Sequence, residues 1–472
     1  MKKLFLAAVN SQYSHTNLAV RILRAVSEPF VEVVCEEFNI NQPSFIPYRH
    51  IISSKPNFLG FSCYIWNIDY ILKLARDIKS ALPEVIIILG GPEVSFKAKE
   101  LKRDYPFIDY IICGEAEQSF PLLLKSLIKE TTHSPSQMYE LDDAFPDSPF
   151  PYENLTHGEA ENRLIYYETA RGCPFRCTYC LSGSISEICP GGSRLRELSI
   201  DRVKREVKFL ASRGVKTLKL VDRTFNANKS RAAELMRFFS SGTGDMCIHL
   251  EIAADLLNDE MLEILSSAPK GKFQIEAGIQ SFNENTLEAV RRKTNLELVR
   301  NNILALTESG NCHVHIDLIA GLPLEGFESF KHSFNKAYAL NADMLQLGFL
   351  KVLPGSVIET QCEKYGIVYR HYAPYEVIST DCISHEEVIK LKCMSYVLDV
   401  YYNKARNREY IEFVVDSSQL TPFELFSRLS EYLDERGLLD RPMSSTNQYE
   451  VLRSFAEDYF GIIIPLPPPK LK

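Results

Sequence analysis

The sequence predicts an α/β protein of three parts: an open parallel sheet, a partial barrel of six strand–helix units, and a mainly helical C-terminal extension. Three observations support this prediction. Short apolar runs alternate with amphipathic segments, which is typical of parallel sheets covered by helices on both faces. A polar stretch punctuated by prolines separates two series of such runs. After the second series the glycine-terminated runs stop, and longer amphipathic segments follow.

The first part, residues 1–135, is expected to form a doubly wound, Rossmann-like (flavodoxin-like) sheet. Its expected helices cover residues 18–26 and 70–82, and its clearest apolar strands are 4–10, 58–65, 85–91 and 110–117. Open parallel sheets bind ligands outside the carboxyl ends of their strands. The candidate ligand-binding loops are therefore 10–15, 62–67, 90–94 and 114–117.

Residues 136–162 have the composition of a linker, and residues 163–365 form the second strand–helix series. Six units are too few for a full eight-unit barrel, so a partial (β/α)6 barrel is expected. Its strands are expected at 163–170, 215–222, 246–253, 272–281, 312–321 and 344–355. Residues 366–472 are expected to be mainly helical, with amphipathic helices over 388–405 and 422–437.

Composition excludes several classes of protein. The net charge of −8 argues against non-specific coating of nucleic acid, although a local basic groove stays open. No apolar stretch approaches the roughly 20 residues that span a bilayer. The apolar run after Lys3 is shorter than a signal-peptide core and fits a buried first strand, so a cytoplasmic location is expected.

One tight cysteine cluster stands out among twelve cysteines. Cys173, Cys177 and Cys180 follow the first strand of the second series. Three thiolates on one loop can hold three irons of a [4Fe-4S] cluster and leave the fourth iron open to a substrate. A structural zinc site is an alternative, with Cys189 as a fourth ligand, and a redox pair would need only Cys177 and Cys180.

The segment ARGCPFRCTYC (170–180) resembles the signature of the radical S-adenosylmethionine (SAM) superfamily, in which an aromatic residue such as Tyr179 precedes the third cysteine. The segments LVDRTFN (220–226), IEAGIQSFNENTL (275–287), DLIAGLPLE (317–325) and VLPGS (352–356) resemble later barrel segments of its cobalamin-dependent members. This resemblance implies that the three cysteines bind a cluster that cleaves SAM.

The resemblance also implies roles for barrel residues. Asp222 is expected near the methionine amine, Glu276 and Gln280 near the ribose, and Gly321 and Leu353 beside the adenine. For Glu276, an ion pair with a nearby Lys or Arg is the competing interpretation. Gly321 is equally well explained as a turn residue.

The first part resembles the cobalamin-binding domain that precedes the barrel in many radical enzymes, on the segments LGFSCYIWN (59–67), LGGPEVSF (89–96) and CGEAEQSF (113–120). Gly90 and Gly91 would let backbone approach the corrin closely. The implied cofactor-binding residues are Asn10, Ser62, Trp66, Gly90, Gly91, Gly114 and Glu115.

The first loop departs from that resemblance, because it lacks the Asp-x-His-x-x-Gly motif that supplies a histidine to cobalt. His15 has the wrong spacing, so a loop or capping role is favoured for it. Trp66, the only tryptophan, is a candidate for the lower cobalt face; a packed surface aromatic is the alternative.

These features predict a cobalamin-dependent radical SAM enzyme that forms a 5′-deoxyadenosyl radical and methylates an unactivated centre of a small molecule or peptide. An electron donor such as flavodoxin or ferredoxin is the expected partner. One alternative is a radical SAM enzyme that modifies RNA or protein without cobalamin. Another is a non-catalytic zinc or ligand-binding sensor.

Overall fold

The computed structural model describes residues 2–131, 135–136, 138–141, 145–189, 192, 194–404, 406–439 and 441–465. This part of the chain divides into two compact units. The first comprises residues 1–251, 353–359 and 371–375, and the second comprises 252–352, 360–370 and 376–472. The units differ from the predicted domains 1–135, 163–365 and 366–472, because the barrel strands are shared between them.

A five-stranded parallel sheet opens the first unit. Its strands are β1 (Lys3–Asn10), β2 (Glu32–Asn39), β3 (Phe58–Ser62), β4 (Ile86–Gly90) and β5 (Tyr110–Ile112), in the order β2-β1-β3-β4-β5. This order is that of flavodoxin-like sheets, whose direction of winding reverses between the first and third strands. The predicted open sheet is therefore confirmed, with β2 as an additional strand at its edge.

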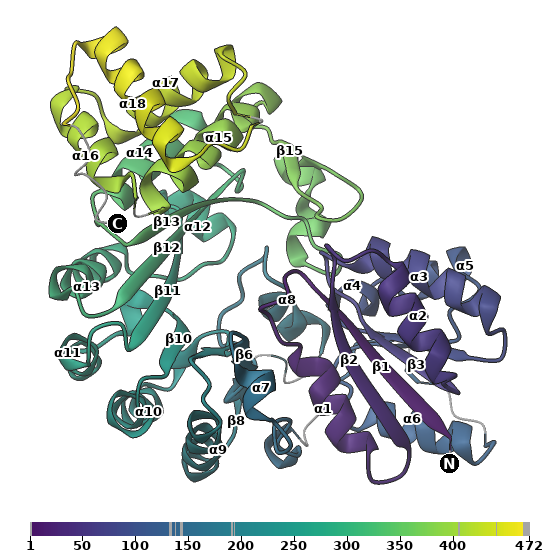
Figure 1. Ribbon diagram of the computed structural model, residues 1–472. Coiled ribbons are helices and arrows are strands. Elements are labelled where there is room, and N and C mark those ends of the chain that lie inside the picture. The colour runs from purple at the N-terminus through teal and green to yellow at the C-terminus, as the bar shows by residue number, and fades with distance from the viewer. Residues whose placement is uncertain are drawn as a thin grey trace. The chain divides into compact units, whose positions relative to one another are not determined.

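Helices cover both faces of this sheet. They are α1 (Leu18–Ser27), α2 (Phe45–Ser54), α3 (Ile68–Ala81), α4 (Pro92–Ser95), α5 (Ala98–Asp104) and α6 (Ser119–Ile128) (Figure 1). Along β1, Phe5 and Ala7 pack in one core with residues of α2 and α3, while Leu4 and Leu6 pack in a second core with α1 and α6. Successive strand side chains point to opposite faces, so a continuous apolar run fits a sheet buried on both sides.

The barrel strands are β6 (Leu164–Tyr167), β9 (Thr217–Leu220), β10 (Cys247–Ile252), β11 (Phe273–Gln280), β12 (His313–Ala320) and β13 (Met344–Phe349). They form one sheet in the order β13-β12-β11-β10-β9-β6. All six coincide with the strands predicted from the apolar runs. Two short strands, β7 (Ala170–Arg171) and β8 (Arg196–Glu197), pair in an antiparallel ribbon near the cysteine loop.

Asparagines begin the helices that follow the barrel strands. The side chains of Asn228, Asn258, Asn283 and Asn295 each accept a hydrogen bond from the first turn of α10 (Lys229–Gly242), α11 (Asp259–Ser267), α12 (Glu284–Ala289) and α13 (Leu296–Ser309). An N-cap oxygen satisfies one of the free N–H groups of a helix start. In α9 (Ile200–Ser212), Ser199 has the same role.

The C-terminal extension contains α15 (His385–Leu398), a π-helical turn (Asp399–Asn403), α16 (Arg408–Ser417), α17 (Pro422–Glu435) and α18 (Ser445–Phe460). It packs on the barrel part of the second unit. Phe423 of α17 contacts Phe334 of α14 (Phe327–Tyr338), and the Ser395 hydroxyl donates to the Leu347 carbonyl of β13 at 3.1 Å. The mainly helical prediction is confirmed. No helix among the described residues has the length and apolarity that crossing a bilayer requires, and the cytoplasmic location stays a prediction.

Candidate functional site

The three clustered cysteines lie on the loop between β7 and α8 (Leu181–Ile188). Cys173 and Cys177 are buried, while Cys180 is half-buried and occupies the N-cap position of α8. Burial raises the pKa of the Cys173 thiol; the Phe175 N–H and the Thr224 hydroxyl lower it, and the charges of Cys180 and Cys177 raise it. The loop therefore gathers the three sulfurs near one another, with Tyr179 half-buried between the second and third.

Close backbone contacts fix this loop. A Cβ on Gly183 of α8 would lie 2.5 Å from the Cys177 carbonyl oxygen, so only glycine allows α8 to approach the loop. The segment after β13 also binds here. The Ile358 N–H donates to the Thr178 carbonyl at 2.9 Å, and the Val357 N–H donates to the Ser184 hydroxyl at 2.9 Å. Leu353 begins the turn that leads into this segment, and its carbonyl accepts from Ser356.

The three cysteine sulfurs do not all lie within 4.8 Å of one another. Among the described residues, the trio of His, Cys, Asp or Glu groups with all ligand atoms within 4.8 Å of one another is Glu276, His315 and Asp317, not the cysteines. Thiolates on a single zinc, at bonds of about 2.3 Å, stand under about 4 Å apart.

Cys189 lies away from the other three cysteines. It is the C-cap residue of α8, whereas Cys180 is the N-cap. A rise of about 1.5 Å per residue separates the two by roughly 13 Å along the helix. The Cys189 thiol donates instead to the Tyr139 carbonyl at 3.0 Å. The four-cysteine zinc site that the sequence left open is not assembled here.

Asp222 follows β9 and is buried in a network of its own. Its carboxylate accepts hydrogen bonds from the N–H of Thr169, at 2.7 Å, and from the Thr169 hydroxyl. Burial raises the pKa of Asp222 to about 7, although these hydrogen bonds lower it. Asp222 thus joins the end of β9 to the segment that enters the cysteine loop, and its expected contact with the methionine amine stays a prediction.

A cavity of about 310 Å³ lies in the first unit, at the carboxyl ends of β3, β4 and β5. The cysteine loop and α8 form part of its wall through Gly172, Leu181 and Ser182. Of the predicted cobalamin-domain residues, those that line it are Ser62, Gly90, Gly91, Gly114 and Glu115. Cys173, Cys177 and Cys180 are not among the lining residues, so the cavity brings the candidate ligand loops of the sheet to the two ends of the cysteine loop and not to the sulfurs themselves.

Gly90 and Gly91 both line the cavity, but only one of them must be glycine for the sake of the backbone. Gly91 has a φ of +114°, and a Cβ there would lie 2.4 Å from the Cys63 carbonyl oxygen, so the turn itself demands glycine. At Gly90 a Cβ would meet no protein atom closer than 3.9 Å. A Cβ at Gly90 would make only ordinary van der Waals contact with Ile112, so protein packing does not demand glycine there, and its place in the cavity lining fits close approach of a bulky ring.

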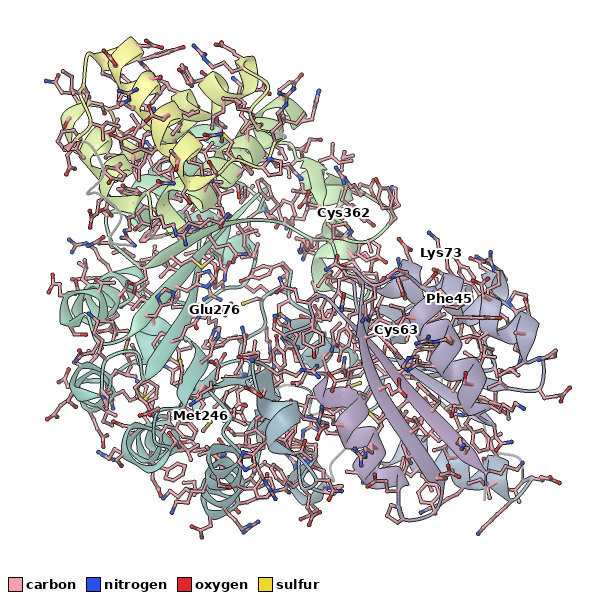
Figure 2. The ribbon with its side chains drawn as sticks, viewed as in Figure 1. Phe45, Cys63, Lys73, Met246, Glu276 and Cys362 are labelled. Carbon is pink, nitrogen blue, oxygen red and sulfur yellow. The ribbon has the colours of Figure 1, made fainter. Side chains whose placement is uncertain are left out.

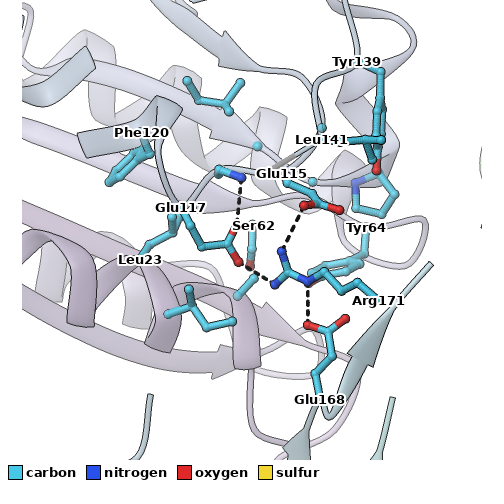
Figure 3. A pocket seen from close by; sticks show the side chains of 18 of the residues that line it. Leu23, Ser62, Tyr64, Glu115, Glu117, Phe120, Tyr139, Leu141, Glu168 and Arg171 are labelled. Atoms are coloured by element: carbon cyan, nitrogen blue, oxygen red, sulfur yellow. Dashed lines mark hydrogen bonds and ion pairs between the residues drawn. The ribbon is translucent and has the colours of Figure 1, made fainter. Parts of the chain in front are cut away.

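Arg171 forms the centre of an ion network on the cavity wall (Figure 3). Its guanidinium binds Glu117, Glu168 at 2.8 Å and Glu115 at 3.4 Å. Arg196 holds both oxygens of Glu115, at 2.6 and 2.7 Å. Two arginines therefore hold the Glu115 carboxylate in place on the cavity wall.

Trp66 and Asn10 are not among the residues that line the cavity. Trp66 stacks on Tyr64 with ring centroids 4.5 Å apart and planes 5° apart, and Tyr64 lines the cavity. Asn10 donates to the His15 carbonyl and to Glu37. Tyr64 is therefore one of the aromatic residues of the cavity lining, and Trp66 stacks on it from outside that lining; the cofactor roles of Trp66 and Asn10 stay predictions.

The loop after β1 pairs with the barrel strand β6 instead of entering the cavity. The Leu164 N–H donates to the Ser14 carbonyl at 2.7 Å, and His15 forms a parallel bridge with Leu164. The His15 ring bonds Ser11 and Tyr166 at 3.3 and 3.2 Å. Its pairing fits the loop role expected for His15.

Glu276 and Gln280 lie on one face of β11 in the second unit, where half-buried residues alternate with buried ones (Figure 2). In register with Glu276, His315 of β12 places its Nε2 atom 3.0 Å from Asp317. Gln280 has a φ of +75° at a bulge of the strand pair. Gly321, with a φ of +82°, packs against Val377. Their SAM roles stay predictions.

Sequence reasoning missed several cavity residues. Tyr64, Glu117, Glu168, Arg171, Arg196 and Arg223 line the cavity without having been singled out. Tyr64 and Glu117 could have been found from the sequence, because both lie in loops that follow predicted strands. Arg196 and Arg223 come from elsewhere in the chain, and only the fold brings them to this wall.

Three family models match the chain. They are the B12 binding domain over residues 6–124, the radical SAM superfamily over 167–337, and a protein family of unknown function, DUF4080, over 363–463. The first match covers most of the five-stranded sheet, and the second covers the cysteine loop and the four barrel strands β9 to β12.

Two curated relatives are methyltransferases by name. The cobalamin-dependent radical SAM methyltransferase TokK of Streptomyces tokunonensis is 25% identical over 78% of this chain and 58% of its own length. The 2-(S-pantetheinyl)-carbapenam-3-carboxylate methyltransferase of Streptantibioticus cattleyicolor is 27% identical over 65% and 48%. The chain thus spans about half the length of these curated relatives.

The fold is also that of a solved radical enzyme. The cobalamin-dependent SAM radical enzyme OxsB, with aqua-cobalamin and SAM bound, matches with a TM-score of 0.68 at 14% identity, over 96% of this chain and 79% of its own. The chain therefore consists of a B12-binding domain, a radical SAM domain and a DUF4080 C-terminal region, and it is homologous to the cobalamin-dependent radical SAM methyltransferases.

Proposed function

We propose that this protein is a cobalamin-dependent radical SAM methyltransferase that acts on an unactivated centre of a small molecule or peptide. The observation that carries the proposal is the composition of one cavity wall: Ser62 and Gly90 of the sheet line the same cavity as Leu181 and Ser182 of the cysteine-loop helix. When bound, the [4Fe-4S] cluster would supply the electron that cleaves SAM to a 5′-deoxyadenosyl radical, and cobalamin would carry the methyl group.

The chain's own residues have separable tasks in this scheme. Cys173, Cys177 and Cys180 would hold three irons, and the close approach of Gly183 to Cys177 would keep the loop in position. Gly90 would leave room for the corrin beside the flat face of Tyr64. The first loop lacks the Asp-x-His-x-x-Gly motif, and its His15 bonds Ser11 and Tyr166, so a side chain that does not ligate cobalt would face the lower side of the corrin.

Cysteine variants test the cluster half of the proposal. We expect Cys173→Ala, Cys177→Ala and Cys180→Ala, after anaerobic reconstitution, each to lose most bound iron and sulfide and all 5′-deoxyadenosine formation on reduction. Cys382→Ala is the matched control, because Cys382 is exposed and lies outside the loop. Cys189→Ala should also keep the iron. Zinc in place of iron, or iron retained by all three variants, would contradict the assignment.

Corrin binding tests the other half. Gly90→Val would place a branched side chain in the cavity lining, where a Cβ meets no clash, so we expect tight cobalamin binding to fall at least tenfold while the protein stays folded. Iron content serves as the control, because Gly90 is not on the cysteine loop. The reduced enzyme would draw its electron from a donor such as flavodoxin or ferredoxin.

A radical SAM enzyme that modifies RNA or protein without cobalamin is the second candidate. Its support is the similarity to a tRNA-2-methylthio-N(6)-dimethylallyladenosine synthase of Psychrobacter, at 24% identity over 57% of this chain. Iron-replete protein that takes up no corrin would favour it over the first proposal.

A further inference from the structure

Two segments from the second half of the chain belong to the first unit. They are residues 353–359, which follow β13, and residues 371–375, which lie inside the DUF4080 match. The remaining residues of that match belong to the second unit. A region whose family is of unknown function therefore supplies part of the unit that contains the cavity and the cysteine loop.

Tyr375 binds the loop that leaves β4 at the cavity. Its hydroxyl donates a hydrogen bond to the carboxylate of Glu93, and Glu93 directly follows Gly91 and Pro92, which line the cavity. Tyr375 and Glu93 are only 5% and 6% exposed. A buried polar group that loses its hydrogen-bond partner is destabilising, because it has also lost its contacts with water. This contact therefore holds the loop after β4 in place.

The backbone of Tyr375 is itself held in an uncommon conformation. Its φ is +57°, in the left-handed region that residues with a side chain seldom adopt. Its N–H donates to the Tyr372 carbonyl at 2.8 Å, which closes a turn. Such conformations persist only where the surrounding structure imposes them, and they are frequent at functional sites. The turn fixes the tyrosine that reaches Glu93.

Residues 353–359 contact the cavity wall and the cysteine loop at once. Gly355 has a φ of +81°, and a Cβ there would lie 2.3 Å from the ring of Phe96, which lines the cavity. Further along the segment, the Ile358 N–H donates to the carbonyl of Thr178 at 2.9 Å. Thr178 is fully buried and stands between the second and third cysteines of the loop.

Glu359 joins the two segments. Its carboxylate accepts a hydrogen bond from the Gly355 N–H at 2.8 Å. Burial raises the pKa of Tyr375, and the nearby groups Glu93 and Glu359 raise it further, so Glu359 lies close to the tyrosine as well. A continuous path of contacts thus runs from the loop after β4 to the cysteine loop. Close-packed interiors transmit small displacements, because neighbouring groups have no free space into which to relax.

We propose that Tyr375 and Gly355 are positioning residues that couple the cavity to the cysteine loop, so that occupation of one site tightens binding at the other. The inference deepens the proposed function and rests on it for the two ligands, cobalamin and the iron–sulfur cluster. Coupling between two binding sites is reciprocal, so it can be measured from either side. It gives the DUF4080 segment 371–375 a task in the unit to which it belongs.

A binding cycle on the full chain tests this coupling. Cobalamin binding is measured by anaerobic equilibrium dialysis, with and without the reconstituted cluster. We expect the cluster to tighten cobalamin binding at least fivefold in the parent, and less than twofold in Tyr375→Phe and in Gly355→Ala. The ratio is the readout, because a general loss of stability weakens binding in both states.

Two variants serve as controls for the binding cycle. Tyr372→Phe removes a hydroxyl from the same segment, where the side chain is 62% exposed, and should keep the parent ratio. Glu93→Gln retains an oxygen that can accept from Tyr375 and should keep it too. A ratio near one in the parent, or the parent ratio in Tyr375→Phe, would overturn the proposal.

Amide hydrogen exchange of the cofactor-free chain separates this failure from failure of the proposed function. Tyr375→Phe should speed exchange in residues 91–98 and also in the cysteine loop, residues 172–184, whereas Tyr372→Phe should change neither. Acceleration confined to residues 91–98 would show a purely local contact and overturn the coupling. If the parent binds no cobalamin, the proposed function fails, and the exchange result alone decides the role of Tyr375.

Discussion

Removal of the Arg171 side chain tests the ion network of the cavity wall most severely. Arg171 is 13% exposed, and its partners Glu117, Glu115 and Glu168 are 8%, 13% and 18% exposed. In the Arg171→Ala variant, Glu115 keeps its ion pair with Arg196, but Glu117 and Glu168 lose their ion pairs with Arg171. Breaking a buried ion pair by removing one partner costs about 3–5 kcal/mol, so we expect a loss of this size in the free energy of unfolding.

The loss should depend on pH. Burial raises the pKa of Glu117, and Arg171 reverses that shift so that the net pKa is lowered. Without Arg171 the pKa of Glu117 in the folded state should lie above its unfolded value, so the folded variant takes up a proton that the unfolded chain releases. The stability of Arg171→Ala therefore falls as pH rises above the ordinary glutamate range, whereas in the parent the contribution of Glu117 is already complete there and does not change.

The assay is urea unfolding of the apo protein at pH 5 and pH 8, with Arg103→Ala as the matched control. Arg103 pairs with Asp104 on the surface, where both are well exposed, so we expect no measurable change in that variant. A deficit for Arg171→Ala below about 1 kcal/mol, or one of equal size at both pH values, would refute the account of the network.

Three further predictions concern single contacts. Asp222→Asn should remove part of the pH dependence of stability. Burial raises the pKa of Asp222 to about 7, so the parent loses stability as pH rises from the ordinary carboxyl range to about 7. The unfolding free energy should therefore differ less between pH 5 and pH 8 in the variant than in the parent. Gly183→Ala should lower bound iron after reconstitution, because the new Cβ would lie 2.5 Å from the Cys177 carbonyl oxygen; full iron content would contradict this. Ser384→Ala should cost about 1 kcal/mol of unfolding free energy, because Ser384 caps α15, and an unchanged midpoint would count against the capping box.

Much of the fold could be predicted because its strands are apolar throughout. The runs around Phe5, Ile87 and Ile316 are buried on both faces, which makes them visible without any knowledge of their neighbours. Strand β2 was not predicted, because its residues are not apolar throughout. It lies at the sheet edge, and Glu32 and Glu36 interrupt its apolar character, so no strand-like run appears in the sequence.

The site was predictable where its chemistry is local. Cys173, Cys177 and Cys180 lie within one loop, and the resemblance of that loop to a known signature implies the iron–sulfur cluster. The ion network of the cavity wall has no such local pattern, because Arg171 and Arg196 pair with glutamates that are distant in sequence.

The central claim is that the cysteine loop and the sheet build one centre for two cofactors. The most direct test is electron paramagnetic resonance of the reduced, reconstituted protein with and without cob(II)alamin. Because one cavity is lined by both Gly90 and Ser182, the account predicts that the cluster spectrum broadens when corrin is present, and that Cys177→Ala removes the cluster spectrum altogether. Two unperturbed spectra that simply add, or iron-replete protein without corrin, would contradict it.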